Sequence, residues 1–177
     1  AAQTISVSPS APASAAFGTS FTVGATASSG LPVTVSTSGS CTNVGNVVTI
    51  TSGAGTCTVN YDQAGDADYL AAPQVTETTA AAKAAQTISV SPSAPASAAF
   101  GASFTVGATA TSGLPVAITT SGSCTGSGTS TATITINSGA GTCTVNYDQA
   151  GDADYLAAPQ VTETTAAAKA AQTISVS

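Results

Sequence analysis

Four cysteines carry the most reactive side chains in this sequence. They are Cys41 and Cys57, followed by Cys124 and Cys143. Four cysteines allow three pairings, but the chain is a tandem duplication and each copy holds one pair. The duplication therefore favours Cys41–Cys57 and Cys124–Cys143, and such bridges imply an oxidising compartment. The alternatives are two buried free thiols per copy, or a zinc site, which the lack of His and of Cys-x-x-Cys disfavours.

Three aspartates in one loop of each copy have side chains suited to a metal ion. These candidates are Asp62, Asp66 and Asp68 in the first copy and Asp148, Asp152 and Asp154 in the second. Ca²⁺ takes about six to eight oxygen ligands, which three carboxylates could begin to supply. Their spacing matches no established calcium loop, however, and Asp next to Gly also forms turns through its own side chain. We therefore predict no metal and no other cofactor, and keep the six aspartates as calcium candidates.

Two tyrosines per copy could stack against a sugar. Tyr61 and Tyr69 recur as Tyr147 and Tyr155. Tyr61 has the same strand parity as Cys57 and Val59, which predicts a core position rather than a binding platform. We expect Tyr69 to close the end of the domain together with its neighbour Leu70.

Two further patterns each have a functional and an ordinary interpretation. Lys83 and Asn60, assisted by Glu77, have the residue types for a self-catalysed cross-link, but Lys83 and Glu77 could equally be a solvated pair beside a linker. The run Thr131–Thr135 alternates Thr with apolar residues, as an ice-binding face does. Outward Thr on any solvated strand explains that run equally well.

The composition excludes several classes of function. The chain has 177 residues, two cations in total, a net charge of −6 and no His. No cationic cluster is present to displace phosphate counterions, so we expect no nucleic-acid partner. Nothing approaches the ~18 apolar residues of a membrane span, so we expect no membrane insertion. Without a nucleophile–base pair, catalysis is not expected. With 42% hydrophobic residues, the chain should fold rather than be disordered.

The chain repeats itself. The string AAQTISVSPSAPASAAFG begins at Ala1 and again at Ala84, and AAQTISVS begins a third time at Ala170. The division is therefore residues 1–83, residues 84–169 and, in residues 170–177, the first strand of a third repeat. The second copy is longer by three residues, all of them between its cysteines: Cys41 and Cys57 are 16 apart, and Cys124 and Cys143 are 19 apart.

Alternating apolar and polar residues predict short β-strands throughout each copy. In the first copy they are Gln3–Ser8, Phe21–Ala27, Val33–Ser36, Asn46–Thr51, Thr56–Tyr61 and Gln74–Ala81. The one helix-prone stretch, Ala80–Ala85, is too short to be stable alone. Six or seven strands of this kind predict an all-β, two-sheet sandwich. Its core is small and draws on Val and Ile together with Phe17, Phe21, Leu31 and Leu70.

Three stretches of each copy resemble a family of bacterial immunoglobulin-like repeats found in large surface and secreted proteins, including adhesins. They are QTISVS, SGLPV (29–33) and AGDADYLAAP (64–73), and they recur in the second copy. The resemblance implies two tandem immunoglobulin-like β-sandwich domains in an elongated rod, an extracellular or cell-surface location, and no catalytic residues. The last strand departs from the family pattern, since Thr79 and Ala81 replace larger apolar residues. This departure predicts a weakly packed strand at an open edge.

The function that fits these observations is a structural spacer or stalk module of an extracellular repeat protein or surface fibre. The alternative is a carbohydrate- or protein-binding adhesive module. The expected partners are neighbouring repeats of the same chain and other copies in a fibre. The junction Thr78–Gln86 lacks Gly, Pro and Ser, which predicts a rigid connection. A further hypothesis is that a first strand, such as the one carrying Ile174 and Val176, pairs across a junction, although pairing within its own repeat is favoured.

Overall fold

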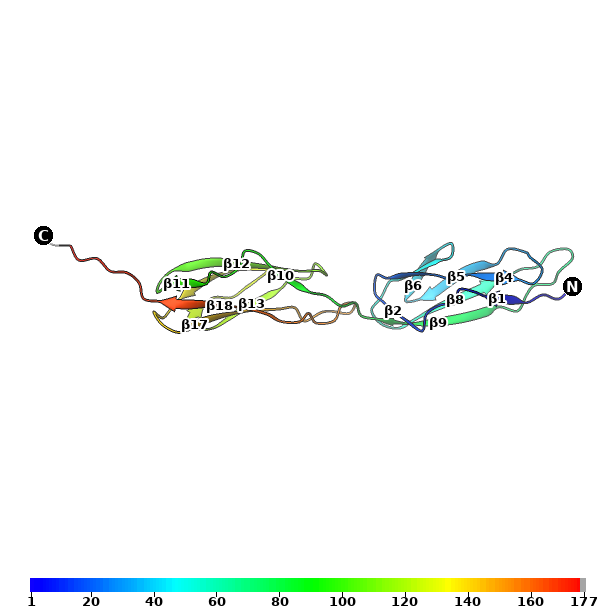
Figure 1. Cartoon of the computed structure of the whole chain (residues 1–177). Coiled ribbons are helices and arrows are strands. Elements are labelled where there is room, and N and C mark those ends of the chain that lie inside the picture. Colours follow the sequence, from blue (N-terminus) through cyan, green and yellow to red (C-terminus); the bar gives the residue numbers. More distant parts are fainter. Residues whose placement is uncertain (176–177) are drawn as a thin grey trace. The chain divides into compact units, whose positions relative to one another are not determined.

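The structure is a computed structural model and describes residues 1–175. Every regular element in that range is a β-strand, and no helix occurs there. The chain divides into two compact units (Figure 1). Unit 1 contains Ala1–Ala84 together with Asp152–Tyr155, and unit 2 begins at Ala85. Each is described below by the strands of its own copy of the repeat.

The first copy forms three sheets. Its strands are β1 (Ile5–Val7), β2 (Ser14–Ala16), β3 (Ser20–Thr22), β4 (Ala25–Ala27), β5 (Thr34–Gly39), β6 (Cys41–Val44), β7 (Val47–Ile50), β8 (Thr56–Asp62) and β9 (Val75–Ala82). One sheet has the order β2-β9-β8-β5, another has the order β3-β7-β6, and β1 pairs with β4. All pairs are antiparallel except β2 with β9, which is parallel.

The second copy repeats this arrangement with two more strand pairings, both made by an additional short strand. Its strands are β10 (Ile88–Val90), β11 (Ser97–Ala99), β12 (Ser103–Ala110), β13 (Ala117–Gly122), β14 (Cys124–Thr125), β15 (Gly128–Thr129), β16 (Thr131–Ile136), β17 (Thr142–Asp148) and β18 (Val161–Ala168). Because β15 pairs with both β13 and β16, all of these strands belong to one continuous path, β10-β12-β16-β15-β13-β17-β18-β11, with β14 beside β16.

Strand parity decides which residues enter the core. Along β8, Cys57, Val59 and Tyr61 are buried, whereas the residues between them point outward. Val48 and Ile50 on β7 are buried in the same cluster, with Phe21 packed against it. These inward residues are those that the alternation predicts, because successive side chains of a strand point to opposite faces.

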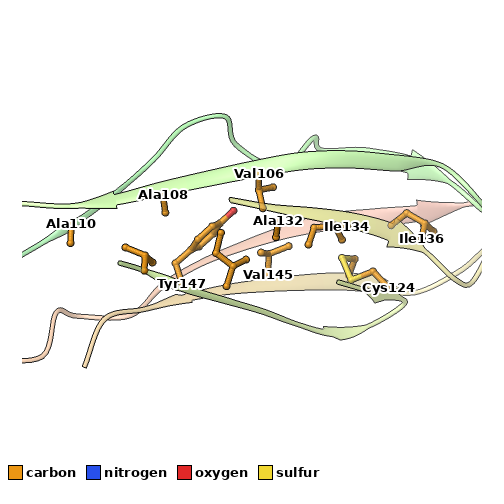
Figure 2. Close-up of a cluster of buried hydrophobic side chains, with 12 residues drawn as sticks. Val106, Ala108, Ala110, Cys124, Ala132, Ile134, Ile136, Val145 and Tyr147 are labelled. Carbon is orange, nitrogen blue, oxygen red and sulfur yellow. A yellow bond between two sulfur atoms is a disulfide. The ribbon is translucent and has the colours of Figure 1, made fainter. Parts of the chain in front are cut away.

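The core of the second copy is built in the same way. Val106, Ala108 and Ala110 extend from β12 toward Val145 and Tyr147 on β17, and Ile134 and Ile136 fill the space between them and the disulfide (Figure 2). Small alanines and the large Tyr147 ring belong to the same buried cluster, as close packing of side chains of different volume allows.

Gly24 and its counterpart Gly107 are among the glycines fixed by close backbone contact. The segment at Ser8 and Pro9 runs against Gly24, with hydrogen bonds from Ser8 N to Gly24 O (2.7 Å) and from Gly24 N to Pro9 O (2.9 Å). A Cβ on Gly24 would lie 2.5 Å from the Ser8 carbonyl oxygen. Only glycine permits this approach without a backbone shift.

The last strand differs from its prediction. β9 is eight residues long and lies inside its sheet, between β2 and β8, rather than at an open edge. The short strand β2, which the alternation does not predict, covers that edge. Thr79 is fully buried, and its hydroxyl donates to the Pro12 carbonyl oxygen at 2.8 Å. A buried threonine is tolerated because this hydrogen bond satisfies its hydroxyl.

Other sequence expectations also change. The predicted strand Phe21–Ala27 is interrupted into β3 and β4 in the first copy, while its counterpart β12 is continuous. Ala80–Ala82, in the helix-prone stretch, belongs to β9. Leu70 is 68% exposed rather than in the core, because it lies in the loop before β9, and Phe100, the counterpart of Phe17, is 54% exposed.

The first strand of each copy pairs within that copy. Ile5 lies opposite Ala27, and Ile88 opposite Ala110, in the same register. Residues 170–175 form no strand, and Val176 lies outside the described residues. Pairing across a junction is therefore not what the two complete copies show.

Candidate functional site

The reactive and polar side chains of this chain form three kinds of stabilising contact inside each copy. We call these contacts, a disulfide and two hydrogen-bond networks, the fastenings. The first is covalent. Cys41 on β6 is bonded to Cys57 on β8, and Cys124 on β14 is bonded to Cys143 on β17. In the first copy this bond joins two different sheets. All four cysteines are buried. A reductant in solution can therefore reach their sulfur atoms only after the surrounding strands open.

The second fastening is a pair of buried glutamines at the end of each copy. Gln3 donates from Nε2 to Gln63 Oε1 (2.6 Å) and to the Leu70 carbonyl oxygen (2.7 Å). The Ser29 hydroxyl donates to Gln3 Oε1. Gln63 Oε1 also accepts from the backbone N–H of Gly65. The Gln3 side chain thereby connects the segment before β1, the turn at Ser29 and the long loop before β9.

The same network recurs around Gln86, Gln149 and Ser112. Gln86 Nε2 donates to Gln149 Oε1 at 2.7 Å and to the Leu156 carbonyl oxygen at 2.7 Å. The Ser112 hydroxyl donates to Gln86 Oε1. These networks give SGLPV and AGDADYLAAP, the two most specific stretches of the resemblance, a physical role: each supplies partners to one buried glutamine.

The third fastening links a tyrosine to a carboxylate. The Tyr61 hydroxyl donates to Glu77 Oε2 at 2.7 Å, and the backbone N–H of Ala11 donates to the same oxygen at 2.9 Å. Tyr147 and Glu163 repeat the contact at 2.6 Å. Burial raises the pKa of the Tyr61 and Tyr147 hydroxyls well above its usual range, and the hydrogen bond to the neighbouring carboxylate adds to the rise. Both tyrosines are therefore core residues, as their parity predicts, rather than a sugar platform.

The candidate calcium ligands form turns and surface contacts. Asp66 Oδ1 accepts from the backbone N–H groups of Asp68 and Tyr69, and Asp152 Oδ1 does the same for Asp154 and Tyr155. Asp62 and Asp148 each accept from a glutamine side chain instead. Within residues 1–175, no group of three or more His, Cys, Asp or Glu side chains is close enough together to hold a metal ion.

The cross-linking residues are not brought together. Asn60 points outward from β8, where its Oδ1 accepts from the Thr76 hydroxyl at 3.0 Å. Glu77 lies on the opposite face of the sheet, bonded to Tyr61. A carboxylate on the far face of the sheet cannot assist chemistry at the Asn60 amide.

The run Thr131–Thr135 lies on β16 as the alternation predicts. Its Ala132 and Ile134 are buried, and Thr131 and Thr133 are exposed. Thr135 exchanges a hydrogen bond with the Ser103 hydroxyl on β12 at 2.8 Å. Such cross-strand hydroxyl pairs stabilise any solvated sheet face.

The described part of the chain offers no concave site. No pocket occurs in it, and no buried side-chain nitrogen or oxygen there lacks a hydrogen-bond partner. It also holds no helix with the length and apolar character needed to cross a membrane. A ligand site normally combines a hollow with a few polar groups that converge on it.

Sequence reasoning did not identify Gln3, Gln63, Ser29 and Thr79 as fastening residues. The signal available was their exact recurrence at the same place in both copies, next to the most specific stretches. Gln3, Gln63 and Ser29 lie outside the strands, where alternation says nothing about burial.

The two buried disulfides also bear on location. Such bonds form and persist in oxidising environments outside the cytosol. The chain is an extracellular or cell-surface protein.

Comparisons with known proteins give only distant similarity. No family model matches the chain, and no curated protein matches it. Among solved structures, it is similar to a crystal structure of the S-layer protein rSbsC, residues 31–844, with 16% identity and a TM-score of 0.43, over 97% of this chain and 29% of that one. It is also similar to a structure of the surface layer protein SbsC, domains 1–6, with 16% identity and a TM-score of 0.37, over 96% and 28%. This chain thus spans less than a third of either.

Proposed function

We propose that this chain is a structural spacer in an extracellular repeat protein or surface fibre, made of tandem immunoglobulin-like β-sandwich domains without catalytic activity. The strand order supports the sandwich: the sheet β2-β9-β8-β5 and the group formed by β1, β3, β4, β6 and β7 supply the inward residues of a single core in the first copy. The disulfide between β6 and β8 then joins the two layers.

The observation that carries this proposal is that the polar side chains inside each copy form hydrogen bonds with other parts of the same copy. The buried Gln3, Gln63 and Thr79 all bond to other parts of their own copy. A catalytic or ligand-binding module instead keeps polar groups poised for a molecule that is not part of the chain. The same contacts recur in the second copy, which supports the interpretation that each copy serves as a stable building block.

Binding measurements test this proposal against the adhesive alternative. The two-repeat protein should not bind to a glycan array or to extracellular-matrix proteins. The result should be the same with and without calcium at about 1 mM, a concentration that fills even weak extracellular calcium sites. The matched variant carries Tyr69→Ala and Tyr155→Ala, which removes the tyrosines outside the core. Binding by the parent that this variant loses would establish an adhesive module and overturn the spacer.

A further inference from the structure

The N-terminal part of each copy runs alongside its last strand. We call the contact between residues 11–17 and β9 the seam. At one end of the seam, the Ala11 N–H donates to Glu77 Oε2. At the other end, the Phe17 N–H donates to the Ala82 carbonyl oxygen at 2.8 Å.

Between these ends, the hydrogen bonds across the seam come from both side chains and backbone. Thr79 donates from its hydroxyl to the Pro12 carbonyl oxygen, and the Ala80 N–H donates to the Ala13 carbonyl oxygen at 2.9 Å. The parallel ladder of β2 with β9 continues the seam from there.

The second copy has the same seam. Thr165 donates to the Pro95 carbonyl oxygen at 2.7 Å, and the Ala94 N–H donates to Glu163 Oε2 at 3.0 Å. The Phe100 N–H donates to the Ala168 carbonyl oxygen at 2.8 Å. The ladder of β11 with β18 is also parallel.

Parallel pairing determines how the seam responds to tension. The chain enters a copy through β1 and β2 and leaves it through β9. Since β2 and β9 run in the same direction, pulling the two ends apart drives the strands past each other along their length. All hydrogen bonds of the seam then bear the load together, whereas an antiparallel hairpin pulled at its open end loses them one at a time.

The disulfides determine how much chain is released once the seam fails. From Ile5 to Ala82 there are 82 − 5, or 77, residue steps, and the Cys41–Cys57 bond short-circuits 16 of them, leaving 61. From Ile88 to Ala168 there are 168 − 88, or 80, steps, and the Cys124–Cys143 bond short-circuits 19, again leaving 61. The three extra residues of the second copy thus lie entirely inside its disulfide loop.

We propose that each copy is a force-bearing unit: the seam resists tension by shear, and the disulfide limits the released chain to the same length in both copies. This deepens the spacer role proposed above and rests on it. The oxidised bond keeps the longer second copy mechanically equivalent to the first.

Single-molecule stretching of the two-repeat protein from its ends tests the seam. The seam variant carries Thr79→Val and Thr165→Val, which keep the side-chain volume and remove the hydroxyl donors. The control carries Thr76→Val and Thr162→Val, which remove similar hydrogen bonds between the last strand and its other neighbour. At a fixed force, the seam variant should unfold about fivefold faster than the parent, the effect of one typical hydrogen bond. The control should unfold at the parental rate, and equal rates for the two variants would overturn the seam.

The same instrument tests the released length. Oxidised protein should give two events of equal length. After reduction, or in a variant with all four cysteines changed to Ala, the events should lengthen by about 52 Å and about 63 Å. These are the loop lengths of 16 and 19 residues, at about 3.6 Å per residue, less the 5.2 Å and 5.1 Å between the Cα atoms that each disulfide already spans. Unequal oxidised events, or lengths that reduction does not change, would overturn the proposal. Glycan binding on the array would overturn the proposed spacer function but would not change these force curves. Failure of the spacer function and failure of the force-bearing unit can therefore be told apart.

Discussion

The segments between the cysteines, Cys41–Cys57 and Cys124–Cys143, are where the two copies differ most. In the first copy, β6 and β7 form a short hairpin whose tip exposes Val44. In the second copy, the tip is polar and β16 is two residues longer than β7. The longer strand pairs with β12 as far as Gly107 opposite Thr131. This pairing accounts for β12 being continuous where the first copy has a break between β3 and β4.

The two copies also protect the same sheet edge by different means. In the first copy, Asn43 covers the edge of β5: its Nδ2 donates to the Val35 carbonyl oxygen at 3.1 Å, and its Oδ1 accepts from the Thr37 hydroxyl at 2.9 Å. In the second copy, the backbone of β15 pairs with β13 instead. An uncovered strand edge is a template for aggregation, so either solution has the same benefit.

The comparison shows where this fold tolerates change. The insertion alters the hairpin and the edge cover, yet the buried glutamine pair and the tyrosine–carboxylate contact recur at distances within 0.1 Å of each other. A disulfide closes the variable segment into a loop with fixed ends in each copy. Variation inside that loop therefore leaves the other fastenings unaffected.

Removing a disulfide should have the largest effect. The pair Cys41→Ala and Cys57→Ala is expected to destabilise the first copy by roughly 3 kcal/mol, and the pair Cys124→Ala and Cys143→Ala should do the same to the second, because loop-closure entropy depends only weakly on loop length. Urea unfolding of the whole chain measures both losses. A difference of more than about 1 kcal/mol between them would show that the insertion is coupled to the rest of its copy.

The buried glutamines should rank next. Gln3→Ala and Gln86→Ala each remove three hydrogen bonds, to a glutamine amide oxygen, to a carbonyl oxygen and from a serine hydroxyl. Their loss in a buried site is expected to cost about 2 kcal/mol. The exposed Gln74→Ala serves as the control and should cost less than about 0.5 kcal/mol. If Gln3→Ala matched the control, the network would not be a fastening.

The tyrosine–carboxylate contact predicts a dependence on alkaline pH. Tyr61→Phe should cost about 1.5 kcal/mol at neutral pH, as for a hydrogen bond to a charged group. The pKa of Tyr61 is raised in the folded chain, so the unfolded chain loses its proton first, and stability should fall as pH rises above about 10. Parent and variant stabilities, measured by urea unfolding from pH 8 upward, should therefore converge. A gap that widened at high pH would contradict this assignment.

Removing Asn43, which covers the edge of β5, should have the smallest effect on the free energy of unfolding. The effect should be confined to the first copy. Asn43→Ala should cost about 1 kcal/mol, since it removes hydrogen bonds at a partly solvated edge. Ser127→Ala, in the exposed tip of the second copy, should change stability by less than about 0.5 kcal/mol. Equal losses in thermal unfolding would mean that Asn43 does not protect β5.

Much of the fold follows from local patterns. Alternation predicts β8 and its buried Cys57, Val59 and Tyr61, because a central strand with one inward face has a strict period of two. It does not predict β2, a three-residue strand of Ser and Ala. The parallel partner of β2 is more than 60 residues away, so no local signal marks it.

The fastenings were harder to predict for the same reason. By hydrophobicity alone Thr79 is a poor core residue, and its burial is explained by its hydrogen bond to the distant Pro12 carbonyl oxygen. By the same measure Leu70 is a good core residue, but Gln3 holds the loop that carries it through the Leu70 backbone and leaves its side chain exposed. In both cases a long-range hydrogen bond overrides side-chain hydrophobicity.

The central claim is that each copy is closed by its own disulfide, and one digestion tests it directly. Lysine occurs only at Lys83 and Lys169, and the chain has no arginine, so trypsin separates the two copies. Digestion of the unreduced protein should give three unlinked fragments, residues 1–83, 84–169 and 170–177. Each of the first two should be lighter than its reduced form by the mass of two hydrogen atoms. A single product in which the copies stay joined until a reductant is added, or fragments with the masses of free thiols, would contradict the claim.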